Sequence, residues 1–382
     1  MNYDNKKKGR GDVLLLGTSY KEKMRSEVEL ILLGCLAKRT ELEELRLNEL
    51  LEMRQDWAFI TGELIRHRVN GNFYTSLSDK QRSYVIGKVR QTLELLSDCY
   101  EQYNAFILDF FERLIIKTDE AGIKVAGLKG VIFNSSIYDL RARRSNDIDI
   151  LVAENNLKKF DSIMREFGFI QSLDKGKTEA TRQQKMIQQM NYHDLVPYIK
   201  KVDQPLIKSI KVDVNFHFDS KEHDITRRIL DEGTQDYIGN GYKTRGLKWT
   251  THLLFLCTHF YREATDSIWT SRASDADLYK IVYVQNSFRE YSRDELLDWC
   301  KIIDKYELNK QCYFTMYYLN KFYPDKIYAE ILERILPEDE SYLNKVRVKG
   351  GEFIERQVDF FESTFDMKYG KDFSQRDFGK IF

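Results

Sequence analysis

Apolar residues recur at every third or fourth position over much of the chain, which is the spacing of one face of an α-helix. The clearest such stretch runs from about residue 80 to residue 117. Its apolar positions alternate in steps of four and three: Val89, Leu93, Leu96, Tyr100, Tyr103, Ile107, Phe110 and Leu114. This stripe predicts one continuous helix of roughly ten turns. A coiled-coil dimer would explain it, but packing against N-terminal helices of the same chain is favoured, because one stripe rarely establishes an oligomer.

A different pattern begins after Gly122, where short apolar runs alternate with polar turns. Residues 124–128 and 147–152 predict strands. Residues 131–138 and 155–167 predict the helices that follow them. Strand, helix, strand, helix in this order is typical of an α/β core.

Two more strands are predicted over residues 192–198 and 210–218. A polar turn at 202–205 joins them into an antiparallel hairpin. The glycine-containing stretch 233–246 predicts a linker. Helical periodicity then returns from Thr250 onward.

The chain as a whole is predicted to be a mainly helical α+β protein. It has 382 residues and only four prolines, which agrees with long helices. We expect an N-terminal helical region over residues 1–120, an α/β core over 121–235 and a C-terminal helical domain over 247–382. The core would hold a mixed sheet between the two helical regions.

Composition disfavours a nucleic acid as the partner. The 60 Lys and Arg residues equal the 60 Asp and Glu residues, so there is no positive excess to hold a long polyanion. Five cysteines, an odd number without a CxxC pair, argue against a disulfide framework or a zinc cage and indicate a reducing compartment. The apolar run at residues 13–16 is too short for a signal sequence or a membrane span. We therefore expect a soluble, cytoplasmic protein.

The most informative polar residues are Asp147 and Asp149, one residue apart in a predicted strand. Side chains alternate between the two faces of a strand, so both carboxylates point to one face and Ile148 points to the opposite, buried face. Neighbouring carboxylates repel each other unless a cation lies between them, and Mg²⁺ prefers oxygen ligands. The pair therefore predicts a magnesium site.

A third acid lies in the second strand of the predicted hairpin. Alternation places Asp213, Asn215 and His217 on one face of that strand. If this strand lies beside the first acidic strand, three carboxylates converge, and two magnesium ions would fit between them. His217 would line the site without binding metal.

His252 and His259 are seven residues apart in a predicted helix, and a role in the core or an interface is favoured for both. No histidine has the spacing of a zinc ligand.

Lys129 and Gly130 stand where a predicted strand turns into a helix. Glycine permits close backbone approach to a phosphate, and free N–H groups at a helix start favour an anion. Lys129 would add a positive charge there, although a plain surface lysine explains it equally well. Arg143 lies in an arginine-rich loop before the acidic pair, and either an ion pair or a phosphate contact would explain it.

These motifs together resemble a known family. The residues that carry the resemblance are Leu128-Lys129-Gly130, Tyr138, Arg143 and the run Asp147-Ile148-Asp149-Ile150-Leu151-Val152. They are similar to the uncharacterised nucleotidyltransferase-like family of the DNA polymerase beta-type nucleotidyltransferase superfamily, over roughly residues 85 to 325. Two positions differ from the usual pattern. The Gly-Ser of the superfamily's phosphate loop is Lys129-Gly130 here, as is typical of this family, and Asn215 stands where the family commonly has a histidine.

The resemblance implies magnesium-dependent transfer of a nucleoside monophosphate from a nucleoside triphosphate to a hydroxyl of an unidentified acceptor: a small molecule, a sugar or a protein. It implies that Asp147 and Asp149 bind two metal ions. It also implies that Asp213 binds the catalytic metal and takes or positions the hydroxyl proton, and that Lys129, Gly130 and Arg143 contact the nucleotide. Two alternatives stay open. One is a catalytically inactive fold used as a binding module, and the other is a phosphotransferase, less favoured because the chain has no P-loop and no set of kinase motifs.

Overall fold

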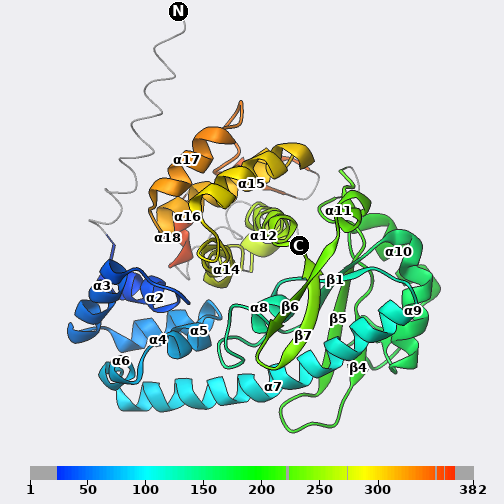
Figure 1. Cartoon of the computed structure of the whole chain (residues 1–382), viewed down its shortest axis with the longest axis horizontal. Helices are drawn as coiled ribbons and strands as arrows, with labels where there is room; N and C mark the ends of the chain where they lie inside the picture. The colour runs from blue at the N-terminus through cyan, green and yellow to red at the C-terminus, as the bar shows by residue number, and fades with distance from the viewer. Residues whose placement is uncertain (1–23, 221–222, 273, 349–350, 357, 366–382) are drawn as a thin grey trace, which may run out of the picture. The chain divides into compact units, whose positions relative to one another are not determined.

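The computed structural model describes residues 24–220, 223–272, 274–348, 351–356 and 358–365. They divide into two compact units, which are described separately (Figure 1). The sheet unit is Gly87–Phe255, and the helical unit combines the described residues up to Ile86 with those from Leu256 onward. The apolar run at 13–16 lies outside the described residues. The division into three regions over residues 1–120, 121–235 and 247–382 stays a prediction, because two compact units in the structure do not show which segments fold independently.

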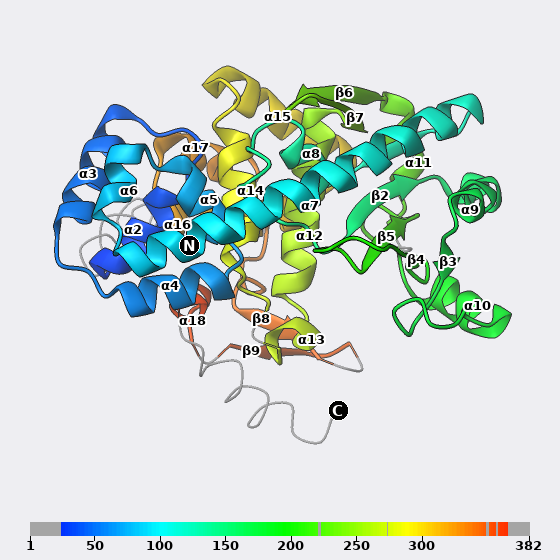
Figure 2. The same cartoon turned by 90° about the horizontal axis from the view of Figure 1, so that it is seen from below.

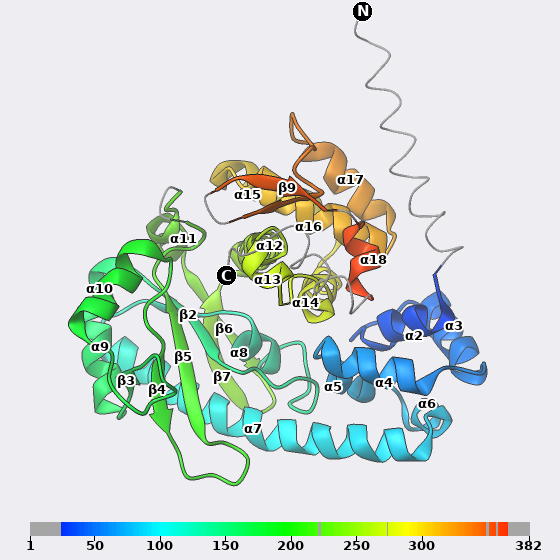
Figure 3. The ribbon, with the colours of Figure 1, turned by 180° about the vertical axis from the view of Figure 1, so that it is seen from behind.

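The sheet unit is built on a mixed sheet of seven strands within the described ranges. In chain order these are β1 Val125–Gly127, β2 Ile148–Val152, β3 Ile170–Gln171, β4 Tyr198–Lys201, β5 Ser209–Asn215, β6 Thr234–Gly239 and β7 Tyr242–Leu247. Their order across the sheet is β3-β4-β5-β2-β1-β7-β6 (Figure 3). The β2–β5 and β1–β7 pairs are parallel, whereas β1–β2 and β4–β5 are antiparallel. The predicted α+β class is confirmed.

Helices flank this sheet. They are α7 Gly87–Glu120, α8 Gly130–Asn134, the 3₁₀-helix η1 Glu154–Asn156, α9 Leu157–Glu166, α10 Arg182–Asn191, α11 Thr226–Glu232 and the first part of α12 Trp249–Ala264. Figure 2 shows α9 and α10 at the end of the sheet where β3 and β4 lie. Ile148, Ile150 and Val152 of β2 share one apolar core with Val212 and Val214 of β5. The predicted inward face of the acidic strand is therefore confirmed.

The predicted continuous helix over residues 80–117 is wrong at its N-terminal end. The structure has α6 Asp79–Tyr84, an extended Val85, and only then α7. Two β-branched residues followed by Gly87 have low helix propensity, which explains the break. In the C-terminal half of α7, the stripe residues from Tyr103 to Leu114 are buried in the core of the sheet unit. Packing within the chain thus accounts for that half of the stripe.

The predicted linker over residues 233–246 is also wrong, because β6 and β7 form a hairpin there. Its turn is Asn240-Gly241, and both residues have positive φ, 52° and 80°. Asn-Gly is a strong signal for a two-residue hairpin turn between strands. The Asn240 side chain donates hydrogen bonds of 2.8 Å to the carbonyl oxygens of Asn134 and Tyr138. The stretch is therefore an ordered edge of the sheet.

The other predicted hairpin is confirmed with changed boundaries. β4 pairs with β5 antiparallel, from Tyr198 opposite Val212 to Lys201 opposite Ser209. Residues 192–197 precede β4 and contribute an isolated bridge between Asp194 and Asn215.

The helical unit contains two segments that are far apart in the sequence. The first has α2 Ser26–Gly34, α3 Glu41–Glu52, α4 Trp57–Arg66, α5 Asn70–Ser76 and α6. The second has the end of α12, α13 Ser267–Thr270, α14 Leu278–Phe288, α15 Arg293–Tyr306, α16 Asn309–Phe322, α17 Lys326–Arg334, α18 Phe360–Thr364 and the β8 Lys345–Arg347 and β9 Phe353–Glu355 pair. All five cysteines lie in described residues as free thiols. Among the described helices, none has both the length and the apolar character needed to cross a membrane.

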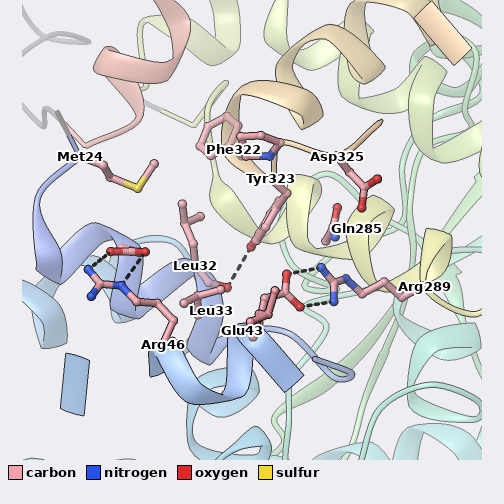
Figure 4. A pocket seen from close by; sticks show the side chains of 13 residues that line it. Met24, Leu32, Leu33, Glu43, Arg46, Gln285, Arg289, Phe322, Tyr323 and Asp325 are labelled. Atoms are coloured by element: carbon pink, nitrogen blue, oxygen red, sulfur yellow. Dashed lines mark hydrogen bonds and ion pairs between the residues drawn. The ribbon is translucent and has the colours of Figure 1, made fainter. Parts of the chain in front are cut away.

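Two ion pairs border a cavity of about 150 Å³ in the helical unit (Figure 4). Arg289 donates to both carboxylate oxygens of Glu43, at 2.7 and 2.6 Å, across 246 residues of sequence. Arg46 donates to both oxygens of Glu29, at 3.1 and 2.7 Å. These two pairs neutralise their own charges, Asp325 adds one further carboxylate to the lining, and none of the predicted site residues lines the cavity.

A pair of glycines lets β1, β7 and α7 approach closely. Gly127 of β1 lies opposite Gly246 of β7. A Cβ atom on Gly127 would lie 2.7 Å from Phe111 Cζ and 3.0 Å from the carbonyl oxygen of Arg245. Contacts this short force side chains and backbone apart.

We therefore expect Gly127→Ala to lower the free energy of unfolding by about 2 kcal/mol, measured by urea denaturation. Gly87→Ala is the matched control, because a Cβ there meets nothing within 4 Å. Equal stability of the two variants would show that β1 and β7 are not packed this tightly.

Candidate active site

The pairing of β2 with β5 brings the three predicted acids together. The strands are parallel, with Asp149 opposite Asp213. Carboxylate oxygens of Asp147, Asp149 and Asp213 lie within 4.8 Å of one another. Asn215 Nδ2 also donates to the carbonyl oxygen of Ile150 at 3.3 Å, which ties the two strands together. The expected convergence of the acids is confirmed, and we refer to the three residues as the acid cluster.

Burial makes the charge of the acid cluster costly. The Asp149 side chain is 12% exposed, and burial raises its pKa above the usual range, with Lys129 opposing the shift and Asp147 adding to it. Burial also raises the pKa of Asp213 to about 7, and repulsion from Asp147 contributes. A raised pKa means that burial and repulsion disfavour the charged carboxylate more than the neighbouring lysines favour it. The cluster is therefore suited to a cation.

Two lysines supply part of that charge. Lys129 Nζ lies 2.8 Å from Asp149 Oδ1. Lys211 Nζ lies 2.6 Å from Asp213 Oδ2 and 3.4 Å from Asp147 Oδ2. Burial would lower the pKa of Lys211, but these two carboxylates outweigh it and raise that pKa above its ordinary value. Our sequence reasoning missed Lys211, although its position two residues before Asp213 places it on the same face of the strand.

The loop after β1 has an unusual backbone at Lys129. Its φ and ψ angles are 49° and −120°, a region that favours glycine. Lysine therefore occupies a backbone conformation that glycine adopts without strain. The Lys129 N–H donates to His252 Nε2 at 3.3 Å, which helps to hold the loop. α8, only five residues long, begins at the next residue, Gly130.

The remaining predicted residues take different places. The Arg143 side chain is buried, and Asn104 and Asn134 donate to its carbonyl oxygen at 2.9 and 3.3 Å. His217 Nδ1 lies 3.3 Å from Asp224 Oδ1, and His217 does not belong to the acid cluster.

His259 belongs to the helical unit. There its Nε2 atom lies 3.5 Å from Glu263 Oε1. His252 is buried and belongs to the sheet unit, and our sequence reasoning did not foresee its contact with the Lys129 backbone.

Comparison with known proteins agrees with this geometry. A family model described as "Uncharacterised nucleotidyltransferase" matches residues 54–324, more than two thirds of the chain. The chain belongs to this nucleotidyltransferase family. The match begins earlier than the resemblance over residues 85 to 325, so α4, α5 and α6 are part of the family's pattern. No curated protein matches the chain.

The acid cluster of this family member has ligand atoms that suit a magnesium ion. Its ligand atoms are all carboxylate oxygens, which suit Mg²⁺ or Mn²⁺ better than softer metals. The three carboxylates exceed the two lysine ammonium groups by one negative charge. The residues present therefore fit a divalent cation.

The positive φ of Lys129 predicts that glycine and alanine at this position differ in the stability that they give the folded protein. Lys129→Gly and Lys129→Ala both remove the ammonium group from Asp149, but only glycine adopts the positive φ without strain. We expect Lys129→Gly to be more stable than Lys129→Ala by about 1 kcal/mol, after allowing for the larger chain entropy of unfolded glycine. Urea denaturation of both variants measures this difference, and a more stable alanine variant would contradict it.

His252 predicts a dependence of stability on pH. Burial lowers its pKa from 6.5 to about 4, so the folded protein keeps it neutral where the unfolded chain protonates it. The stability that this histidine contributes is present above pH 6.5 and is lost as the pH falls through 4. We therefore expect the stability advantage of the wild type over His252→Gln to narrow between these pH values. Denaturation experiments measure the free energy of unfolding of both proteins. A difference between them that stays constant from pH 6.5 to pH 4 would contradict a lowered pKa for His252.

Proposed function

We propose that this protein is a magnesium-dependent nucleotidyltransferase that moves a nucleoside monophosphate from a nucleoside triphosphate to a hydroxyl group of an acceptor. The observation that carries the proposal is the acid cluster, formed by Asp149 and Asp213 on the adjacent strands β2 and β5 and by Asp147 directly before β2. Membership of the nucleotidyltransferase family supports a nucleoside triphosphate as the donor. The proposed acceptor is a small molecule, a sugar or a protein.

Each acid has a proposed role. Asp147 and Asp149 would hold two Mg²⁺ ions, with Asp213 as a further ligand of one of them. When bound, the ions would offset the negative charge on the α-phosphate and the departing pyrophosphate. Asp213 would accept the proton of the acceptor hydroxyl. The hydroxyl oxygen then bonds to the α-phosphorus, and the bond from that phosphorus to pyrophosphate breaks.

The residues around the β1 loop would bind the triphosphate. The N–H groups of Gly130 and Val131 precede the first intrahelical hydrogen bond of α8, which Ile132 donates to the Lys129 carbonyl oxygen. They would donate to phosphate oxygens. Lys129 would add its positive charge, and Arg143, in the loop that leads into β2, would contribute a second cation.

A binding module without catalysis is the second candidate, and one observation favours it. Lys129 and Lys211 already pair with all three acids, so lysine charge alone offsets much of the repulsion. Such a protein would bind a nucleotide and transfer nothing.

The position of a radioactive label separates these functions. The protein is incubated with Mg²⁺, candidate acceptors, and ATP, GTP, CTP or UTP labelled at the α- or the γ-phosphate. Transfer of the α-label to an acceptor supports nucleotidyl transfer, and transfer of the γ-label alone supports a phosphotransferase. Magnesium-dependent nucleotide binding without transfer of either label supports the binding module.

We expect Asp149→Asn to lower α-label transfer at least about a hundredfold. Its thermal melting temperature should stay unchanged or rise, because the substitution removes a buried charge that Asp147 repels. Asp203→Asn is the matched control, since Asp203 is exposed in the β4–β5 turn. A collapse of the fold in Asp149→Asn would mean that this acid is structural.

A further inference from the structure

Lys211 has a place in the acid cluster that a metal ion would also need. Its ammonium nitrogen lies 2.6 Å from Asp213 Oδ2 and 3.4 Å from Asp147 Oδ2. It therefore bridges an acid of β5 and an acid that directly precedes β2. A cation bound between the same two oxygens would lie against the ammonium group, and two like charges at such a distance repel each other strongly. Lys211 and a metal at this position are mutually exclusive.

Lys129 differs from Lys211 in this respect. Lys129 pairs with one acid of the cluster, Asp149, and its backbone lies in a strained loop. Lys211 pairs with two acids and projects from the regular strand β5. Its side chain is 38% exposed, so the ammonium group can leave the carboxylates without crossing the core. A lysine side chain is flexible and acts on phosphates as a point charge.

The balance of charge indicates when the Lys211 ammonium group would leave Asp147 and Asp213. A metal ion alone would add positive charge beside Lys211 and would have to displace it into water. A nucleoside triphosphate that arrives with its metal ions offers the displaced ammonium group new anionic partners. Displacement is thus less costly when metal and nucleotide bind together than when metal binds alone.

We propose that Lys211 is a displaceable cation that disfavours metal binding at Asp147 and Asp213 until a nucleotide is present, and that its ammonium group then contacts the phosphates. Lys211 is thereby a nucleotide-binding residue that couples the two binding events. This inference rests on the proposed function, because it takes the acid cluster as the metal site.

The inference predicts opposite changes in two affinities. Lys211→Met removes the competing cation, so Mn²⁺ without nucleotide should bind roughly tenfold more tightly than to the wild type. The same variant lacks the phosphate contact, so the nucleotide should bind roughly tenfold more weakly at saturating Mg²⁺. A residue that merely supported the fold would weaken both.

The experiment uses the full chain. Binding of Mn²⁺ alone is followed by electron paramagnetic resonance, and binding of each of the four nucleoside triphosphates by calorimetry. Lys208→Met is the matched control, because Lys208 is exposed just before β5, and it should leave both affinities unchanged. Lys211→Gln removes the charge but keeps a hydrogen-bond donor, and it should reproduce both effects if Lys211→Met fails to fold.

The failure of this inference is distinguishable from the failure of the proposed function. If the wild type transfers the α-label but both folded Lys211 variants bind Mn²⁺ no more tightly than the wild type, the role of Lys211 is wrong and the nucleotidyltransferase proposal stands. If Asp149→Asn binds Mn²⁺ as the wild type does, the acid cluster is not the metal site and both proposals fail.

Discussion

The parallel pairing of β2 with β5 is the constraint on which the candidate site depends. It places Asp149 opposite Asp213, while Ile148, Ile150, Val212 and Val214 enter the core below them. A slip of one residue in either strand would turn its acids into the core and its apolar side chains outward. Burial of the apolar face thus sets the strand register that assembles the acid cluster. The same packing that stabilises the sheet therefore fixes the geometry of the site.

That arrangement gathers three carboxylates at one partly buried place beside the interior strands β2 and β5. The surrounding chain compensates in several ways. Lys129 and Lys211 donate to the carboxylates, and His252 accepts the Lys129 N–H and stays neutral because it is buried. The positive φ of Lys129 shows that the loop accepts backbone strain while its ammonium group reaches Asp149. Raised carboxyl pKa values and backbone strain thus occur together here, and both are common at functional sites.

Much of this could be predicted from residue order because it rests on short-range rules. Alternation along strands gave the faces of Asp147, Asp149 and Asp213, and the helical periodicity expected from Thr250 onward recurs as α12, α14, α15, α16 and α17. The errors have a common cause. The helix break before Gly87 depends on the low helix propensity of Val85-Ile86-Gly87, and the β6–β7 hairpin depends on the Asn240-Gly241 turn. In both places a longer sequence pattern around these few residues predicted a different structure. The regular apolar stripe over residues 80–117 predicted an unbroken helix, and the glycines of residues 233–246 predicted a linker.

The sequence by itself determined the class of the fold and which side chains share a face, because backbone geometry imposes a period of two on strands and 3.6 on helices. The tertiary structure alone decided that β2 lies beside β5, that β7 joins β1, and that Lys211 bridges Asp213 and Asp147. It also decided that His252 reaches the Lys129 loop across 123 residues. These contacts join segments far apart in the chain, and no local periodicity states which distant segment a buried face will meet.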